Sequence, residues 1–176
     1  FMLKLACTAT RDAAPTATKT HRSAVVARVP LLQWARAEGC PWDAWTCAAA
    51  AEGGHLASLQ WARANGCRWD EETCQLAAKG GHLAVLQWAS AEGWHTCTCP
   101  EAAANGHLAV LQWARANGCD WDWRTCLHAA SNGELAVLQW LRAEGCPWDR
   151  DLCAAMARHR KHYETLAWIE AQTVGA

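Results

Sequence analysis

The spacing of the tryptophans is the feature that most constrains how this chain can fold. A first series recurs at intervals of 27, 27, 25, 27 and 28 residues and consists of Trp34, Trp61, Trp88, Trp113, Trp140 and Trp168. A second series follows eight residues later, or six in the third repeat, and consists of Trp42, Trp69, Trp94, Trp121 and Trp148. A fixed period of 20–50 residues is typical of arrays in which each repeat buries its apolar face against its neighbours. The spacing therefore predicts a repeat array.

One repeat is clearest over residues 66–92, GCRWDEETCQLAAKGGHLAVLQWASAE. Asp70 is expected to cap a short first helix, because its side chain can accept a hydrogen bond from the first backbone N–H groups. A Gly-Gly pair should form the turn, and a second helix is expected from His82 to Gly93. That helix is apolar over an arc of roughly 220°, wider than one buried stripe. It must therefore be covered on more than one side, as in a stack of helix pairs.

Alanines and tryptophans divide the packing between them. The first helix of most repeats contains two or three consecutive alanines, which let neighbouring backbones approach closely, while Trp and Leu fill the layer behind. We expect the tryptophans to be the main source of stability, at about 2 kcal/mol or more per buried large side chain. Replacing Trp88 or Trp113 with alanine is then expected to cost roughly 3–5 kcal/mol.

Charge and cysteine content bound the class of protein. The net charge of −1 and the pI near 6.8 argue against a general attraction to nucleic acid or anionic membranes. No apolar run approaches the roughly 18–20 residues that cross a bilayer. Eleven cysteines, an odd number, indicate buried thiols in a reducing compartment rather than a secreted disulfide scaffold. Disulfides between paired cysteines, such as Cys40 with Cys47, remain an alternative.

Residues 1–28 do not carry the repeat. They are rich in Ala and Thr and contain one acidic residue, which suits a targeting segment, a disordered leader or a degenerate first repeat. We favour a degenerate helical cap from about Lys19. The expected repeat domain covers 29–172, with repeats at about 19–42, 43–69, 70–94, 95–121, 122–148 and 149–172 and a tail at 173–176. The expected location is intracellular and reducing, in the cytoplasm or, if residues 1–28 are a targeting segment, in a plastid.

Four segments resemble the AA-x-x-GH-L-x-x-V core of ankyrin repeats: AAAEGGHLASLQWARANG, AAKGGHLAVLQWASAEG, AAANGHLAVLQWARANG and AASNGELAVLQWLRAEG. The resemblance covers about residues 29–172 and is closest to a short, Trp- and Cys-rich variety. The chain departs from the family's period of 33, being near 27, and lacks its T-P-L-H entry. The missing residues fall where the family has a β-hairpin finger. The resemblance implies an all-α, ankyrin-like helix-turn-helix solenoid of about five to six repeats with shortened inter-repeat loops.

The resemblance also implies a non-catalytic scaffold that binds a protein partner on its first helices and turns. One alternative is a structural subunit of a larger assembly, for example an organellar one. Another is a metal- or redox-responsive cysteine-rich module. We expect neither enzyme activity nor a cofactor, because no motif places a nucleophile beside its base.

Positions that differ between repeats are the better candidates for recognition, since packing explains the positions that are copied. Most follow the Trp-Asp pair that precedes each first helix, and Trp45 and Trp123 are the tryptophans outside both series. Trp and Arg are common interface anchors. The partner-binding candidates are Trp45, Glu71, Glu72, Gln75, Trp123, Arg124, His128, Arg150 and Asp151. The alternative is that these residues are ordinary solvated helix starts.

Three further groups of residues invite a chemical interpretation. His95, Cys97 and Cys99 could help to bind zinc or a soft metal, but C-x-C lacks the C-x₂-C spacing of structural zinc sites, and drift between copies explains it as well. The turn histidines (His55, His82 and His107) are expected to hydrogen-bond backbone across the turn rather than to act in catalysis. The basic run RHRKH at 158–162 is expected to suit a helix end, with docking of an acidic partner as the alternative.

Overall fold

The computed structural model describes residues 26–39, 44–93 and 98–172, and over these residues the chain is helical and contains no strand. The expectation of an all-α chain is confirmed. The helices are α3 (Val29–Ala37), α4 (Ala44–Glu52), α5 (Leu56–Ala64), α6 (Glu71–Lys79), α7 (Leu83–Ala91), α8 (Cys99–Ala104), α9 (Leu108–Ala116), α10 (Trp123–Asn132), α11 (Leu135–Ala143), α12 (Arg150–His159) and α13 (Tyr163–Ala171). In this part of the chain no helix is both long enough and apolar enough to span a bilayer.

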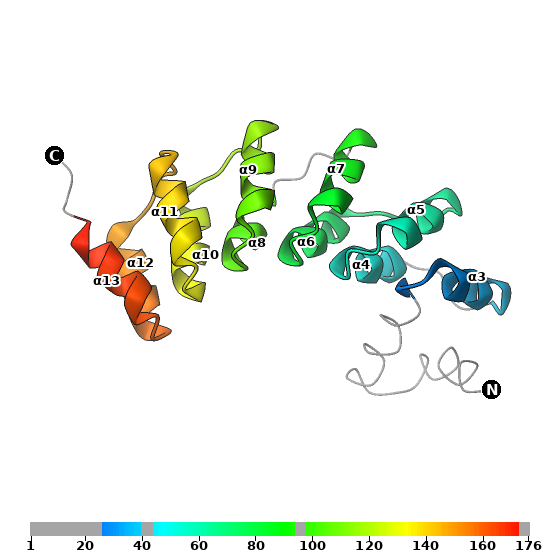
Figure 1. The fold of residues 1–176 in the computed structure, drawn as a ribbon, viewed down its shortest axis with the longest axis horizontal. Coiled ribbons are helices and arrows are strands. Elements are labelled where there is room, and N and C mark those ends of the chain that lie inside the picture. Colours follow the sequence, from blue (N-terminus) through cyan, green and yellow to red (C-terminus); the bar gives the residue numbers. More distant parts are fainter. Residues whose placement is uncertain (1–25, 40–43, 94–97, 173–176) are drawn as a thin grey trace. The chain divides into compact units, whose positions relative to one another are not determined.

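The chain forms two compact units, Phe1–Glu92 and Gly93–Ala176 (Figure 1). In the N-terminal unit, α4 packs against α5 and α6, and α6 packs against α7. In the C-terminal unit, α8 packs against α9 and α10, and α10 packs against α11 and α12, while α12 packs against α13. Each unit is thus built from helix pairs whose first helices lie side by side.

Glycines end both helices of a pair. Gly54 and Gly66 have φ angles of +69° and +81°, in the left-handed region that glycine enters without a steric penalty. Just beyond them, the N–H of His55 donates to Ala50 O at 2.8 Å and the N–H of Cys67 donates to Ala62 O at 3.0 Å. These are the bonds of the Schellman motif, which satisfies carbonyls at a helix end. The regular glycines of the sequence therefore set the period of the fold.

Aspartates begin the first helices. The carboxylate of Asp70 accepts a hydrogen bond from the backbone N–H of Thr73 at 3.1 Å, which confirms the predicted cap. Asp122 accepts from the N–H of Arg124 at 2.9 Å, and Asp149 accepts from that of Leu152 at 2.9 Å. These bonds satisfy N–H groups that have no partner within the helix. The start of each of these helices is therefore encoded locally by the Trp-Asp pair.

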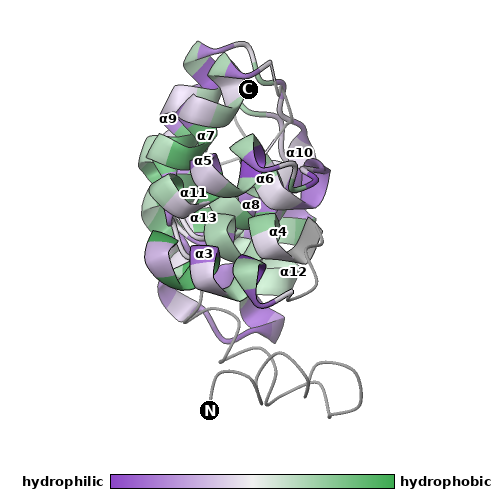
Figure 2. Ribbon diagram, turned by 90° about the vertical axis from the view of Figure 1, so that its right-hand side faces the viewer, coloured by the Kyte–Doolittle hydropathy of each residue, from purple (hydrophilic) through white to green (hydrophobic). Residues whose placement is uncertain are grey.

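The buried core is aliphatic. The largest fully buried side chains include Leu59, Leu111, Leu138 and Val85, and the Ala-rich first helices bury most of their alanines completely. The helix α7 carries no charged residue, and stretches in the hydrophobic colour are visible among the overlapping second helices in Figure 2. Among the described tryptophans, Trp69 alone is buried, at 7% exposed. The prediction that Trp and Leu fill the layer behind the alanines therefore holds for the leucines. It is wrong for most of the tryptophans, because they lie half-buried at the edge of the core.

At that edge the two tryptophan series interlock. A ring of the second series packs against a ring of the first series from the next helix pair, edge-on or tilted, as such pairs prefer. The ring centroids are 5.4 Å apart for Trp69 and Trp88, 5.6 Å for Trp121 and Trp140, and 6.2 Å for Trp148 and Trp168. The guanidinium of Arg115 lies 4.5 Å from the Trp121 ring centroid, a cation–π contact that Arg142 repeats over Trp148 at 4.8 Å. The two tryptophan series in the sequence reflect these contacts between repeats.

Candidate interaction surface and thiol pairs

In the N-terminal unit, the candidate residues lie at the start of first helices. Glu71 and Glu72 are exposed in the first turn of α6, where carboxylates suit the positive end of the helix dipole. The half-buried Gln75 donates from Nε2 to Glu71 Oε1 at 3.3 Å. Trp45 belongs to the first turn of α4, and its side chain lies outside the described part of the chain. The described side chains give this edge an acidic character.

In the C-terminal unit, three candidates come together on α10. Trp123 is 40% exposed at the first position of the helix, and the exposed Arg124 guanidinium lies 5.7 Å from its ring centroid. His128 is exposed one turn further along. The Trp123 ring beside the Arg124 guanidinium offers apolar area, charge and hydrogen-bond donors in one place, and His128 is the i+4 neighbour of Arg124 on the helix. We call Trp123, Arg124 and His128 the α10 surface.

Arg150 has an intramolecular role that the sequence did not reveal. Its Nε donates to the carbonyl of Ile169 at 3.2 Å and its Nη2 donates to that of Glu170 at 3.1 Å, so it caps the last turn of α13. This use of the guanidinium leaves Arg150 out of the α10 surface. Asp151 lies 4.0 Å from Arg150 Nη1, and its side chain is 98% exposed.

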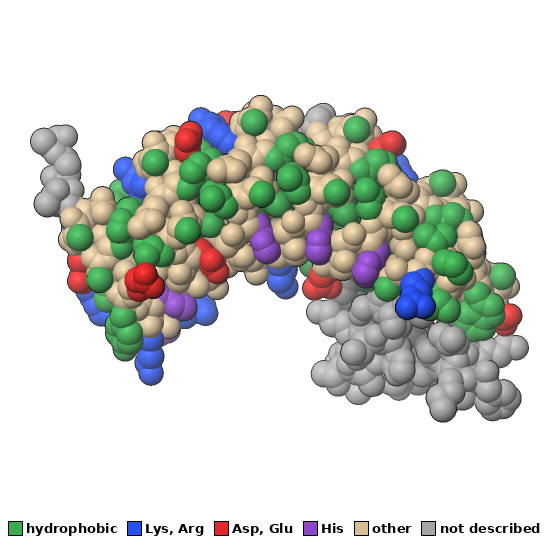
Figure 3. Space-filling model, viewed as in Figure 1, with side chains coloured by type: hydrophobic (Ala, Val, Ile, Leu, Met, Phe, Trp, Pro, Cys, Tyr) green, Lys and Arg blue, Asp and Glu red, His purple; other side chains and the backbone are tan. Residues whose placement is uncertain are grey.

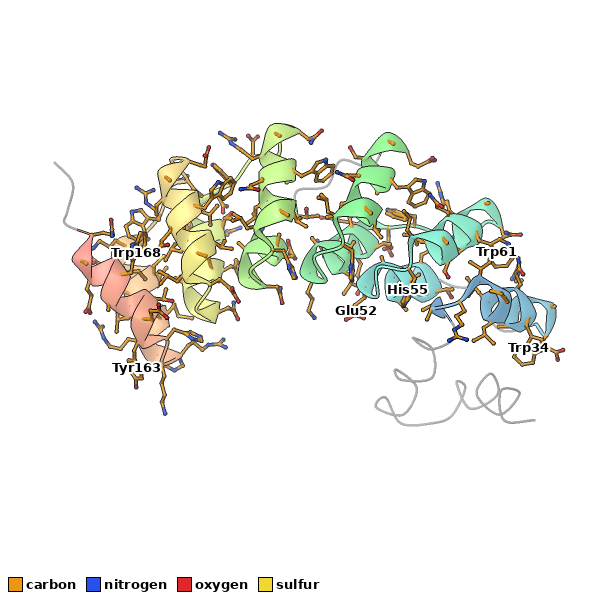
Figure 4. The ribbon with its side chains drawn as sticks, viewed as in Figure 1. Trp34, Glu52, His55, Trp61, Tyr163 and Trp168 are labelled. Carbon is orange, nitrogen blue, oxygen red and sulfur yellow. The ribbon has the colours of Figure 1, made fainter. Side chains whose placement is uncertain are left out.

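Beside the basic run at the α12–α13 turn lies one exposed residue, Tyr163, that the recognition argument missed. Tyr163 is 66% exposed and points away from the helices in Figure 4. It occupies the first position of its helix, where the other second helices of full pairs have a half-buried leucine. His159, Arg160 and Lys161 precede it and are also exposed. The missing signal was the replacement of a leucine by tyrosine at a position that is otherwise copied.

Among the turn histidines, His82 has a structural role. His82 Nε2 lies 2.8 Å from the carbonyl oxygen of Glu52, so the ring bridges to the turn of the preceding helix pair. A Cβ on Gly54 would collide with the same ring, which explains the need for glycine there. Glu52 and His55 lie together at the α4–α5 turn in Figure 4, and histidine side chains reach the surface shown in Figure 3. For His82, this geometry agrees with the predicted backbone hydrogen bonding and extends it to the preceding helix pair.

Cysteines twenty residues apart meet in pairs. The Cys99 Sγ donates to the Cys119 Sγ at 3.2 Å. Cys47 and Cys67 are hydrogen-bonded to each other, as are Cys126 and Cys146. Each pair joins the first turn or so of a first helix to the cysteine that follows the glycine closing the second helix of the same pair. The eight described cysteines are free thiols in this structure.

Burial and hydrogen bonding set the acidity of the thiols. The hydrogen bond with Cys146 and then burial raise the pKa of Cys126, and the same hydrogen bond together with the Arg142 guanidinium lowers the pKa of Cys146. The pKa of Cys47 is raised by its bond to Cys67 and by burial. Burial and the nearby Asp149 raise the pKa of Cys153 to about 12. Cys47, Cys126 and Cys153 therefore stay protonated at neutral pH.

Metal binding gains no support from this arrangement. The described residues contain no group of three or more His, Cys, Asp and Glu side chains placed to hold a metal ion. Cys99 pairs with Cys119, whereas His95 and Cys97 lie outside the described residues.

Comparisons with known proteins do not assign the chain. No protein-family model matches it, and no curated protein matches its sequence.

Proposed function

We propose that this chain is a non-catalytic interaction scaffold with an ankyrin-like solenoid fold that binds a protein partner through the α10 surface. The observation that carries the proposal is the exposure of Trp123 beside Arg124. An exposed tryptophan and an arginine that the fold does not use for packing are the residue types that dominate interface energetics. They occupy positions that differ between repeats, while the copied positions hold the array together.

Several observations support the ankyrin-like assignment. The AA-x-x-GH-L-x-x-V segments coincide with helix pairs joined by glycine turns, and the first helices of neighbouring pairs pack against each other.

The net charge of −1 favours a protein partner over nucleic acid, because phosphate binding relies on clustered positive charge. The buried thiols suit a reducing compartment such as the cytoplasm.

The test compares three full-length chains as bait in affinity purification from the native source. They are the wild type, the double variant Trp123→Ala/Arg124→Ala, and the control Gln139→Ala, which changes an exposed residue of α11. We expect a partner that the wild type and the control retain and the double variant loses. With the purified partner, the double variant should bind at least about 30-fold more weakly, as for loss of an interface hot spot.

Binding at wild-type affinity by a folded double variant would contradict the proposal. A chain that purifies only together with its partner would instead indicate a permanent structural subunit, since obligate interfaces are large and apolar. Circular dichroism of each bait establishes that lost binding is not lost folding.

A further inference from the structure

We propose that Cys99 and Cys119 form a peroxide-sensitive site that closes into a reversible disulfide. The two Sγ atoms are 3.2 Å apart, and a disulfide bond is about 2.05 Å long, so closure requires a movement of only about 1.2 Å. Cys99 is the first residue of α8 and Cys119 follows Gly118 after α9. The disulfide would link the start of α8 covalently to the segment that follows α9. This inference is independent of the α10 surface.

Access to oxidant distinguishes this pair from the others. Cys119 is partly exposed, whereas Cys99 is 0% exposed. In the pairs Cys47–Cys67 and Cys126–Cys146, all four thiols are 0% exposed. Oxidation of cysteine follows both thiolate character and exposure. The pKa of Cys146 is lowered, chiefly by its hydrogen bond with Cys126, but the fold must open before an oxidant reaches that buried thiol. We therefore expect Cys119 to react first.

The chemistry requires a two-electron oxidant, here hydrogen peroxide. The Cys119 thiolate attacks one peroxide oxygen, the O–O bond breaks, and the products are the Cys119 sulfenic acid and hydroxide. The Cys99 sulfur then attacks the Cys119 sulfur and displaces hydroxide, which takes up the Cys99 proton and leaves as water. In sum, two thiols and one peroxide give one disulfide and two waters. A dithiol reductant reverses the reaction by thiol–disulfide exchange.

The experiment treats the native full-length chain with hydrogen peroxide, blocks the remaining thiols and maps cross-linked tryptic peptides by mass spectrometry over time. Cleavage after Arg115 separates the peptide of Cys99 from that of Cys119, and cleavage after Arg142 separates Cys126 from Cys146. Fragment ions distinguish Cys99 from Cys97, which shares its peptide. We expect the Cys99–Cys119 link to form about tenfold faster than the Cys126–Cys146 link, as site-selective oxidation requires, and to disappear with dithiothreitol.

Two variants provide matched controls. Cys119→Ser should abolish the link, whereas Cys146→Ser, at the same position of the next repeat, should leave it intact. Cys99→Ser should trap the Cys119 sulfenic acid, which a dimedone probe detects without requiring any disulfide. The proposal is overturned if Cys126–Cys146 links first, if Cys119 links to Cys97, or if Cys119 oxidises to sulfinic acid in the wild type with Cys99 unchanged. Because the decisive mapping uses the wild type, it does not depend on the folding of a variant.

Discussion

Two buried threonines at the same position of the repeat are held differently. Thr73 and Thr125 are both 0% exposed. The Thr73 hydroxyl donates to Asp70 Oδ1 at 3.0 Å, but the Thr125 hydroxyl has no hydrogen-bond partner among the described residues. The difference follows from Asp122, whose Oδ1 accepts from the N–H of Arg124 instead.

This contrast predicts opposite effects of one substitution. Thr125→Val removes a hydroxyl that was desolvated without compensation, and it should raise the free energy of unfolding by about 1 kcal/mol. Thr73→Val removes the hydrogen bond from the Thr73 hydroxyl to Asp70, and it should lower the free energy of unfolding by about 1 kcal/mol. Urea denaturation of both variants and the wild type measures the two changes. Equal effects at the two positions would show that the hydroxyls are held alike.

Lys161 is the one described residue other than glycine with a positive φ, at 64°. It stands where the preceding turn has Gly133, and its side chain is exposed, so little packing is lost on its removal. Lys161→Gly should therefore raise the melting temperature, with a gain of up to about 1 kcal/mol from relieved left-handed strain. The reverse comparison is Gly118→Ala, where a Cβ meets nothing within 4 Å at a φ of +79°, and a loss of about 1 kcal/mol is expected. Unchanged melting temperatures for both variants in thermal unfolding would argue against strain at these turns.

At the scale of elements, the interlocked tryptophans connect one helix pair to the next. Trp121 and Trp140 meet edge-to-face at 5.6 Å and are half-buried, so the cost of truncation should fall below the 3–5 kcal/mol of a fully buried ring. A double-mutant cycle of Trp121→Leu and Trp140→Leu should give a coupling energy of about 0.5–1.5 kcal/mol. A second cycle, between Trp121 and Trp168, should give coupling near zero, because Trp168 pairs with Trp148. Similar couplings in both cycles would refute a direct contribution from the ring pair.

At the scale of the whole molecule, buried thiols should make the free energy of unfolding fall as the pH becomes alkaline. The folded pKa of Cys153 is raised to about 12, above the value of 9.0 for a free thiol. The unfolded chain therefore loses this proton first, so the stabilising contribution is complete below pH 9 and is lost as pH rises toward 12. The slope for this one group is at most about 1.4 kcal/mol per pH unit. Urea denaturation at pH 8 to 11 should show a shallower decline for Cys153→Ala, and an unchanged decline would assign the effect to other groups.

The candidate site was predictable to the extent that it depended on local positions. The Trp-Asp capping motif placed Trp123 and Arg124 at an exposed helix start, and the structure brings the ring and the guanidinium together. The same reasoning could not find the use of Arg150, because the carbonyls it binds lie 19 and 20 residues away in sequence. Tyr163 was overlooked because the candidates were sought near the starts of first helices, and Tyr163 begins a second helix.

The sequence by itself determined the period, the helix pairs and their boundaries. Asp caps and glycine turns act through hydrogen bonds and φ preferences that span only a few residues, so they can be read from the chain. The tertiary structure decided which copied residues meet: tryptophans at the edge of an aliphatic core, thiols in pairs, and a histidine over the preceding turn. Those contacts join residues about 20 to 30 apart, and burial and side-chain partners at that separation depend on how the helices pack, which no local preference specifies.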